Sequence, residues 1–194
     1  AKEAAIQHLA DQAYARFGAV HLLVNNAGVA VAKSAWETTA QDWEWVMGVN
    51  LYGVTHAIRI FVPRMLAQDE EAHIVNTASM AGMISAPALA AYNVSKFGVV
   101  TLSEGLYHDL TIRKTKIGVS VLCPSWVNTR ITESERNRDA EQRTKPENLE
   151  KVSAKTSAAI MKAVENGLAP EVVAEQVIQA VLDNQFYILT HADS

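Results

Sequence analysis

Residues 20–28 have the sequence Val20-His21-Leu22-Leu23-Val24-Asn25-Asn26-Ala27-Gly28, an apolar run followed by a polar turn. An apolar run of this length between turn residues is typical of a buried strand. Asparagine suits the turn, because its side chain binds nearby backbone and it tolerates the left-handed region. We therefore predict a strand over 20–24 with polar groups at its carboxyl end.

Helical and strand patterns alternate on both sides of this strand. Before it, apolar residues recur at helical spacing up to a glycine that predicts the helix end: Ile6, Leu9, Ala13, Phe17 and then Gly18. After it, Thr38 and Gln41 match a capping box. The further expected elements are a helix to about residue 67 bent at Pro63, a strand over 72–78, a helix over 89–113, a strand over 116–122, helices over 146–166 and 170–184, and a strand over 186–190. Such alternation predicts a parallel α/β sheet with right-handed crossovers, which binds ligands at the carboxyl ends of its strands.

Composition indicates one domain and excludes several classes of protein. The 194 residues are 49% hydrophobic, enough for one sizeable core, and they predict a single domain over 1–194. The net charge of -4 argues against nucleic acid as a partner, because phosphate binding needs a basic surface. No apolar run approaches the ~18 residues that a membrane span needs, so no membrane association is expected.

The single cysteine and the histidines bear on the compartment and on metal binding. Cys123 ends an apolar stretch and is most simply a packed core residue. One cysteine cannot form an internal disulfide, which fits a cytoplasmic protein. The six histidines form no pair at the spacing of a zinc-binding helix, so no metal site is expected. A serine hydrolase is disfavoured too, since Ser79 lies outside a Gly-x-Ser-x-Gly elbow.

A candidate proton-transfer group follows the strand expected over 72–78. Tyr92 and Lys96 stand four residues apart in Ala91-Tyr92-Asn93-Val94-Ser95-Lys96, so in a helix they share one face. A cation beside a phenol favours the phenolate, and we expect Lys96 to lower the pKa of Tyr92 toward the range of a general acid or base. Ser79 is suited to donate a hydrogen bond to a substrate oxygen. The same Tyr–Lys spacing also occurs on ordinary exposed helix faces, so the pair alone leaves both interpretations open.

Five separated segments together resemble the short-chain dehydrogenase/reductase family over nearly the whole chain. They are Asn25-Asn26-Ala27-Gly28, Val46-Met47-Gly48-Val49-Asn50, Ile74-Val75-Asn76-Thr77-Ala78-Ser79, the Tyr92–Lys96 stretch, and Cys123-Pro124-Ser125-Trp126-Val127-Asn128-Thr129. The resemblance implies a Rossmann-like, doubly wound parallel sheet. It also implies a catalytic tetrad, with the tyrosine as general acid/base and the asparagine holding a proton-relaying water: Asn50, Ser79, Tyr92 and Lys96. For Asn50, a polar side chain that simply bonds to backbone is the alternative.

The same resemblance implies NAD or NADP as cofactor and a small-molecule substrate, a secondary alcohol or a ketone or aldehyde. The implied cofactor-binding residues are Asn25, Ala27, Gly28, Thr77, Tyr92, Lys96, Pro124, Ser125, Val127 and Thr129. Ser125 stands where the family has glycine, and glycine alone reaches positive φ at little cost. We therefore expect slightly different backbone freedom beside the nicotinamide. For Asn25 and Asn26, turn chemistry alone is the alternative.

Two further regions gain an expected role from the resemblance. Residues 130–150, which are rich in charged side chains, are implied to form the substrate lid, and a solvated surface segment is the alternative. The helices around 51–65 and 99–110 carry apolar residues on more than one face. Relatives associate through these helices, so a homodimer or homotetramer is expected.

The glycine turn that holds the pyrophosphate in this family, Thr-Gly-x-x-x-Gly-x-Gly, does not occur in the chain. We therefore expect a sheet truncated at its amino-terminal side, without the family's first three strands, which bind the dinucleotide. For the 194 residues alone we expect negligible affinity for NAD(P)H. The alternative function is a catalytically inactive fragment that serves as an interaction or dimerisation module.

Overall fold

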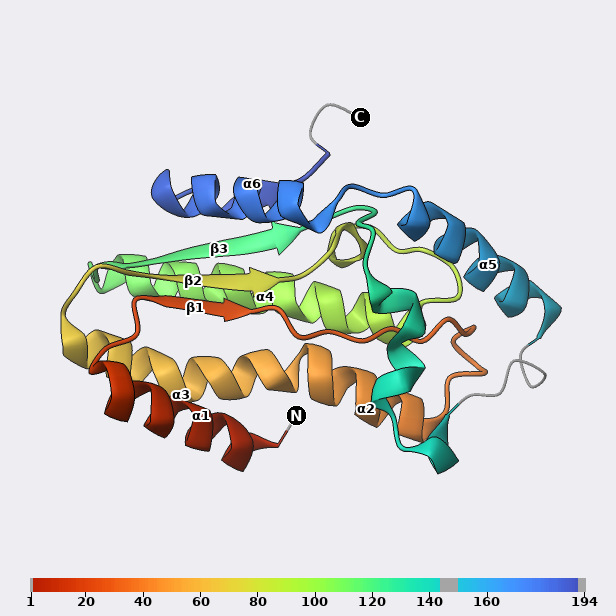
Figure 1. The fold of residues 1–194 in the computed structure, drawn as a ribbon, viewed down its shortest axis with the longest axis horizontal. Helices are drawn as coiled ribbons and strands as arrows, with labels where there is room; N and C mark the ends of the chain where they lie inside the picture. Colours follow the sequence, from red (N-terminus) through yellow and green to blue (C-terminus); the bar gives the residue numbers. More distant parts are fainter. Residues whose placement is uncertain (1, 144–149, 192–194) are drawn as a thin grey trace.

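The centre of the molecule is a parallel sheet with helices on both faces (Figure 1). The computed structural model describes residues 2–143 and 150–191. Within these residues the sheet has four strands in the order β1-β2-β3-β4, and each neighbouring pair is parallel. The strands are β1 (Leu22–Asn25), β2 (Ala72–Thr77), β3 (Ile117–Cys123) and β4 (Tyr187–Leu189). The predicted Rossmann-like α/β architecture is confirmed.

Helices join the strands and cover the two faces of the sheet. They are α1 (Glu3–Phe17), α2 (Ala40–Asn50), α3 (Tyr52–Gln68), α4 (Ala90–Ile112), α5 (Lys151–Glu165) and α6 (Pro170–Leu182), with the 3-10 segments η1 (Met80–Gly82), η2 (Arg130–Asn137) and η3 (Ala140–Gln142). The helices α1, α3 and α4 pack on one face, and α6 packs on the other beside β3 and β4 (Figure 1). No helix in the described ranges has the length and apolar character that crossing a bilayer requires.

Strand β2 lies inside the sheet and is buried on both faces. Ile74 belongs to a core cluster with Phe61 and Leu106 on the α3–α4 face, and its neighbour Val75 belongs to a cluster with Val173 on the α6 face. Ile74 and Val75 are both fully buried, because successive residues of a strand point to opposite faces. The carboxyl end of β2 is therefore held in place by packing from both sides.

The capping box of α2 differs from the predicted one. Thr39 and Asp42 form it, one residue beyond the predicted pair Thr38 and Gln41. The Asp42 carboxylate accepts the Thr39 N–H at 2.9 Å, and the Thr39 hydroxyl accepts the Asp42 N–H at 3.1 Å. The prediction was wrong by one residue. The Asp42 carboxylate, which also binds two charged side chains, takes the place expected for the Gln41 side chain.

The helix expected to reach residue 67 is two helices. Helix α2 ends at Asn50, and Leu51, with φ -108° and ψ -55°, separates it from α3. Helix α3 then runs through Pro63 to Gln68. The break places Asn50 at a helix end, where its side chain reaches the turn that follows β1.

The remaining predicted elements are confirmed with shifted ends. The strand predicted over 20–24 is β1, and the helix predicted over 89–113 is α4. The helix predicted over 146–166 is α5 within the described residues. Residues 144–149, which include much of the end of the predicted lid, lie outside the described residues.

Apolar side chains are exposed on β1 and α1. Leu22 and Val24 of β1 are 51% and 47% exposed, and they lie on the sheet face that α6 covers over other strands. On α1, Leu9 and Phe17 are 60% and 72% exposed. The predicted apolar stripe of α1 therefore only partly faces the core.

Candidate active site

The first turns of α4 present Tyr92 and Lys96 on one face, as their spacing predicted. The Lys96 ammonium nitrogen lies 5.6 Å from the centre of the Tyr92 ring. Lys96 is buried and Tyr92 is half-buried. The pair therefore does not belong to an ordinary exposed helix face, which was the alternative interpretation of the sequence.

The buried ammonium of Lys96 is bonded to the end of β2. Its Nζ donates a hydrogen bond of 2.8 Å to the Thr77 carbonyl oxygen, the only acceptor it has among the described residues. Burial lowers the pKa of Lys96 to about 8, because a cation loses its hydration there. The turn after β1 passes close by, since a Cβ added to Gly28 would lie 3.6 Å from Nζ and 3.7 Å from Asn50 Oδ1. Two N–H groups of the ammonium thus remain for a ligand beside this turn.

Ser79 follows β2 and begins η1. Its Oγ accepts the Ala81 N–H at 3.1 Å and donates to the Pro124 carbonyl oxygen at 3.4 Å. Burial raises the pKa of Tyr92, and a hydrogen bond with Ser79 lowers it by less. The predicted net lowering of the Tyr92 pKa is therefore wrong, because loss of water around the phenolate outweighs the stabilisation from Ser79.

Asn50 uses its side-chain amide to hold the turn after β1. Its Oδ1 accepts the Val29 N–H at 2.8 Å, and its Nδ2 donates to the Val29 carbonyl oxygen at 2.9 Å and to Ser95 Oγ at 3.0 Å. Ser95 in turn donates to the Tyr92 carbonyl oxygen at 2.7 Å. Asn50 thus bonds to backbone, as the alternative interpretation expects, and also to Ser95, and its water-holding role stays a prediction.

The polar residues at the ends of β1 and β2 bind one another. Asn25 donates from Nδ2 to Asn76 Oδ1 at 2.8 Å, and Asn76 donates to Ser103 of α4 at 3.0 Å. Thr77 donates to Asn26 Oδ1 at 3.1 Å. The turn asparagines therefore tie β1 to β2. Sequence reasoning missed Asn76 and Ser103 as parts of this network, and a polar residue inside an apolar strand was the available signal.

The segment after β3 closes the same end of the sheet. Pro124 accepts the Met80 N–H at 2.9 Å, and Ser125 donates its N–H to Thr190 Oγ1 at 3.3 Å. Val127 forms a bridge with Leu168. Thr129 begins η2, where its Oγ1 accepts the Ile131 N–H at 3.4 Å.

All the predicted site residues thus lie at, or just beyond, the carboxyl ends of β1 to β3, or on the helices α2 and α4 beside them. Parallel strands bring these ends to one edge of the sheet. Cys123 at the end of β3 is a free, buried thiol. Across residues 2–143 and 150–191, no three His, Cys, Asp or Glu side chains are grouped in a way that could hold a metal ion.

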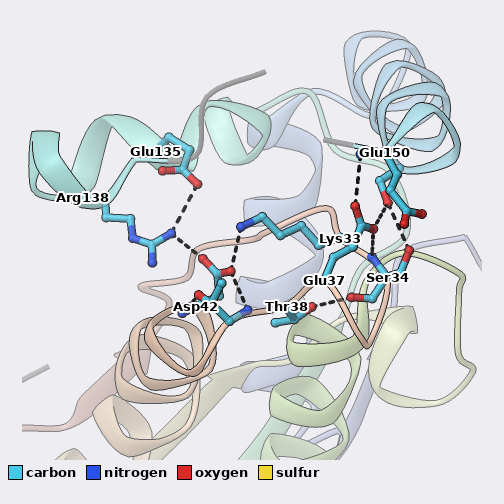
Figure 2. A network of polar contacts seen from close by, with 10 residues as sticks. Lys33, Ser34, Glu37, Thr38, Asp42, Glu135, Arg138 and Glu150 are labelled. Carbon is cyan, nitrogen blue, oxygen red and sulfur yellow. Dashed lines mark hydrogen bonds and ion pairs between the residues drawn. The ribbon is translucent and has the colours of Figure 1, made fainter. Parts of the chain in front are cut away.

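Sequence reasoning also missed a buried group of charges, which we call the Asp42 cluster. It consists of Lys33, Asp42, Glu135 and Arg138 (Figure 2). Arg138 is only 4% exposed, although its charged surroundings in the sequence indicated a solvated segment. Its partner Asp42 lies 96 positions away in the chain. No local pattern marks a pair at that separation.

The chain is similar to known proteins of one family. A family model described as short chain dehydrogenase matches residues 1–140. The CLA biosynthesis dehydrogenase/reductase of Lactiplantibacillus plantarum is 35% identical over 194 residues, covering 99% of this chain and 68% of the relative. The C alpha-dehydrogenase of Sphingobium sp. is 36% identical over 187 residues, covering 95% of this chain and 59% of the relative.

Solved structures are similar over the same span. A short chain dehydrogenase/reductase from Burkholderia phymatum in complex with NAD matches with a TM-score of 0.93 and 45% identity. The match covers 98% of this chain and 68% of that structure. A short-chain dehydrogenase structure from Novosphingobium aromaticivorans matches with a TM-score of 0.76 and 34% identity, covering 99% of this chain and 59% of the other. The chain thus spans about six to seven tenths of these relatives.

Proposed function

The chain belongs to the short-chain dehydrogenase/reductase family, and on that premise we propose that the whole protein interconverts a secondary alcohol with a ketone or aldehyde, using NAD or NADP. One observation carries the proposal. Tyr92 and Lys96 lie on one face of α4 where β2 ends, with the buried cation 5.6 Å from the centre of the phenol ring, and Ser79 follows β2 at the same place. This is the donor set that proton transfer to a carbonyl oxygen requires.

The donor groups at this edge fit a dinucleotide. Lys96 has two N–H groups beyond its bond to Thr77, which suits the adjacent hydroxyls of a ribose. We propose the following residues as the cofactor site: Asn25, Ala27, Gly28, Thr77, Tyr92, Lys96, Pro124, Ser125, Val127 and Thr129. When bound, the cofactor supplies or accepts the hydride. The relative from Lentilactobacillus kefiri is named NADP-dependent and the Burkholderia phymatum structure holds NAD, which supports either cofactor.

The residues of the chain handle the proton. Because burial raises the pKa of Tyr92, its phenol is protonated at neutral pH and ready to donate to a carbonyl oxygen. The Ser79 hydroxyl, which follows β2 at the same place, would orient that oxygen. The Lys96 ammonium stabilises the phenolate as it forms, because the two groups lie close together in a buried place. Asn50 fixes the Val29 turn, and we propose that it also holds the relaying water.

Other features of the whole protein enter the proposal as well. Residues 130–150 serve as the substrate lid of a single domain over 1–194. The free thiol of Cys123 suits the reducing cytoplasm, which we propose as the location. The first three strands, whose glycine turn the chain does not carry, would complete the dinucleotide site in the whole protein.

The decisive experiment compares wild type with Tyr92→Phe in the whole protein, with acetophenone and aliphatic ketones as substrates and NAD(P)H absorbance as the signal. We expect kcat/KM to fall by about 10²–10⁴-fold, the usual contribution of a general acid. Tyr52→Phe is the matched control, since Tyr52 is 52% exposed on α3. We expect it to retain activity within about twofold, as surface substitutions do.

Unchanged turnover in Tyr92→Phe would remove the tyrosine from the mechanism. Calorimetric titration with NAD(P)H separates the alternative function. An interaction module without catalysis would show neither cofactor binding nor ketone reduction in the wild-type whole protein. Micromolar binding together with Tyr92-dependent reduction would exclude it.

A further inference from the structure

The Asp42 cluster joins three separate parts of the chain through one carboxylate (Figure 2). Asp42 Oδ2 accepts hydrogen bonds from Lys33 Nζ at 2.7 Å and from the Thr39 N–H at 2.9 Å. Its Oδ1 accepts a hydrogen bond from Arg138 Nη1 at 2.6 Å. Arg138 also lies 3.6 Å from Glu135, and its guanidinium stacks 5.0 Å from the Trp45 ring centre. The start of α2, the segment after β1 and the lid therefore meet at Asp42.

The ion pairs of the Asp42 cluster are buried, so breaking one of them is costly. The side chains of Lys33, Asp42 and Arg138 are 10%, 1% and 2% exposed. Removing one partner from a buried ion pair leaves a charge without compensation, which is strongly destabilising. Screening by salt is also weak for buried pairs. The lid residues around Arg138 therefore cannot move away unless water enters the cluster.

The Asp42 carboxylate stays charged at neutral pH. Burial raises the pKa of Asp42, but the hydrogen bonds from Lys33 and Arg138 outweigh it, and the pKa is lowered to about 2. A carboxyl group with a lowered folded-state pKa loses its contribution only as the pH falls from ~4 through that value. Asp42 therefore keeps its hydrogen bonds to Lys33 and Arg138 across the neutral range.

The segment that Asp42 binds through Lys33, residues 29–34, contacts the candidate catalytic residues. Val29 is bound through both its N–H and its carbonyl group by Asn50, and the next residue, Ala30, donates its N–H to the buried lid residue Ser134 at 3.0 Å. Lys33 pairs through its backbone with Leu89, the N-cap of the helix that carries Tyr92. Residues 29–34 therefore lie between the lid and the tetrad.

A second carboxylate, that of Glu37, binds both the other described end of the lid and the segment of residues 29–34. Glu37 accepts the Ser34 N–H at 3.0 Å, the Glu150 N–H at 3.1 Å and the Ser153 hydroxyl at 2.5 Å (Figure 2). Ser34 and Ser153 share a further hydrogen bond of 3.2 Å. Both described flanks of the lid thus meet residues 29–42 at a carboxylate.

We propose that Asp42 is a positioning residue for the reaction. By binding Lys33 and Arg138 together, it holds the lid at the distance from residues 29–34 that forms the substrate site beside the tetrad. The proposal rests on the proposed function, since it takes residues 130–138 as part of the substrate lid. Asp42 touches neither the reacting atoms nor the cofactor, so it acts on substrate binding through the lid.

The test uses two variants that differ in the charge they leave behind. Asp42→Asn keeps an acceptor for the Thr39 N–H but leaves two buried cations, whereas Arg138→Met leaves a neutral Lys33–Asp42 pair. We expect Asp42→Asn to lose more thermal stability than Arg138→Met. We expect both to raise the KM for the best ketone of the acetophenone series by at least ~10-fold, with kcat changed by less than about threefold. Asp69→Asn, which breaks an exposed ion pair with Lys116 far from the lid, is the matched control and should leave KM unchanged.

Amide hydrogen exchange reports the lid without substrate. We expect residues 29–34 and 130–138 to exchange at least ~10-fold faster in both variants, with the core strand β2 unaffected. Lower stability without faster exchange in these segments and without a higher KM would make Asp42 merely structural and overturn the proposal. Wild type without ketone reduction would contradict the proposed function instead, and the exchange comparison would still decide whether Asp42 fastens the lid.

Discussion

At the scale of single residues, Lys96 shows how burial prepares a group for chemistry and what it does to stability. Its folded pKa is about 8, below the ~10.4 of a free lysine. Between these pH values the unfolded chain binds more protons than the folded one, so the Lys96 contribution to stability rises with pH across this window. Below pH 8 the penalty for the buried cation is fully present.

We expect the free energy of unfolding of wild type to rise relative to Lys96→Met by roughly 1–3 kcal/mol from pH 7 to pH 10. Urea denaturation of both proteins at matched pH values measures the difference, and the subtraction removes the titration of all other groups. Parallel curves for the two proteins would show that the Lys96 pKa is not lowered.

The same scale shows what the sequence could and could not predict about the site. Tyr92 and Lys96 were found because helical spacing of four residues brings them together. The effect of burial on the Tyr92 pKa was not predicted, because the sequence shows the neighbouring cation but not the loss of water. Asp42 and Arg138 were missed because their pairing depends on tertiary contacts between distant segments.

At the scale of elements, the contact between η1 and α4 sets the position of Ser79 relative to Tyr92. A Cβ added to Gly82 would lie 2.6 Å from the Lys96 carbonyl oxygen and 2.8 Å from its carbon, both backbone atoms that cannot turn aside. We expect Gly82→Ala to lower the free energy of unfolding by roughly 1–3 kcal/mol, because overpacking moves η1 away from α4. Ketone reduction should fall with it, since Ser79 caps η1.

Gly105→Ala is the matched control for this prediction. Gly105 lies in α4, and a Cβ there would meet no atom within 4 Å. We expect this variant to gain roughly 0.5–1 kcal/mol from better helix propensity and to keep its turnover. Thermal denaturation and initial rates of both variants provide the comparison, and equal behaviour of the two alanines would contradict the steric argument.

The elements themselves were largely predictable. The apolar strands and amphipathic helices follow from period alone, and Gly18 ends α1 with φ 77° as expected. The break at Leu51 was not predictable, because the apolar stripe continues through it and Leu51 itself keeps the backbone bond to Met47.

At the scale of the whole molecule, two exposed apolar surfaces compete as sites of association. One lies on the helices α3 and α4 and includes Tyr52, Val94, Phe97 and Tyr107; the other lies on β1 and includes Leu22 and Val24. We propose a homodimer or homotetramer through the α3–α4 surface. Within the described residues β1 is an edge strand, and an edge strand exposes unpaired backbone groups that other chains can bind.

Light scattering at micromolar concentration distinguishes the two surfaces. We expect Phe97→Glu to shift the protein to a monomer, since a buried carboxylate in an apolar interface lacks compensation. Leu22→Lys should leave the oligomer intact. A monomeric wild type, or loss of association in Leu22→Lys alone, would contradict the proposed interface.

The Asp42 cluster also sets an order of events during synthesis. A ribosome adds about 5–20 residues each second, so the arginine that completes the cluster, 96 positions downstream of Asp42, emerges roughly 5–20 s later. Until then Asp42 lacks one of its two buried cationic partners. Because β1, β2 and β3 all precede Arg138 in the chain, these three strands leave the ribosome before the cluster can be completed.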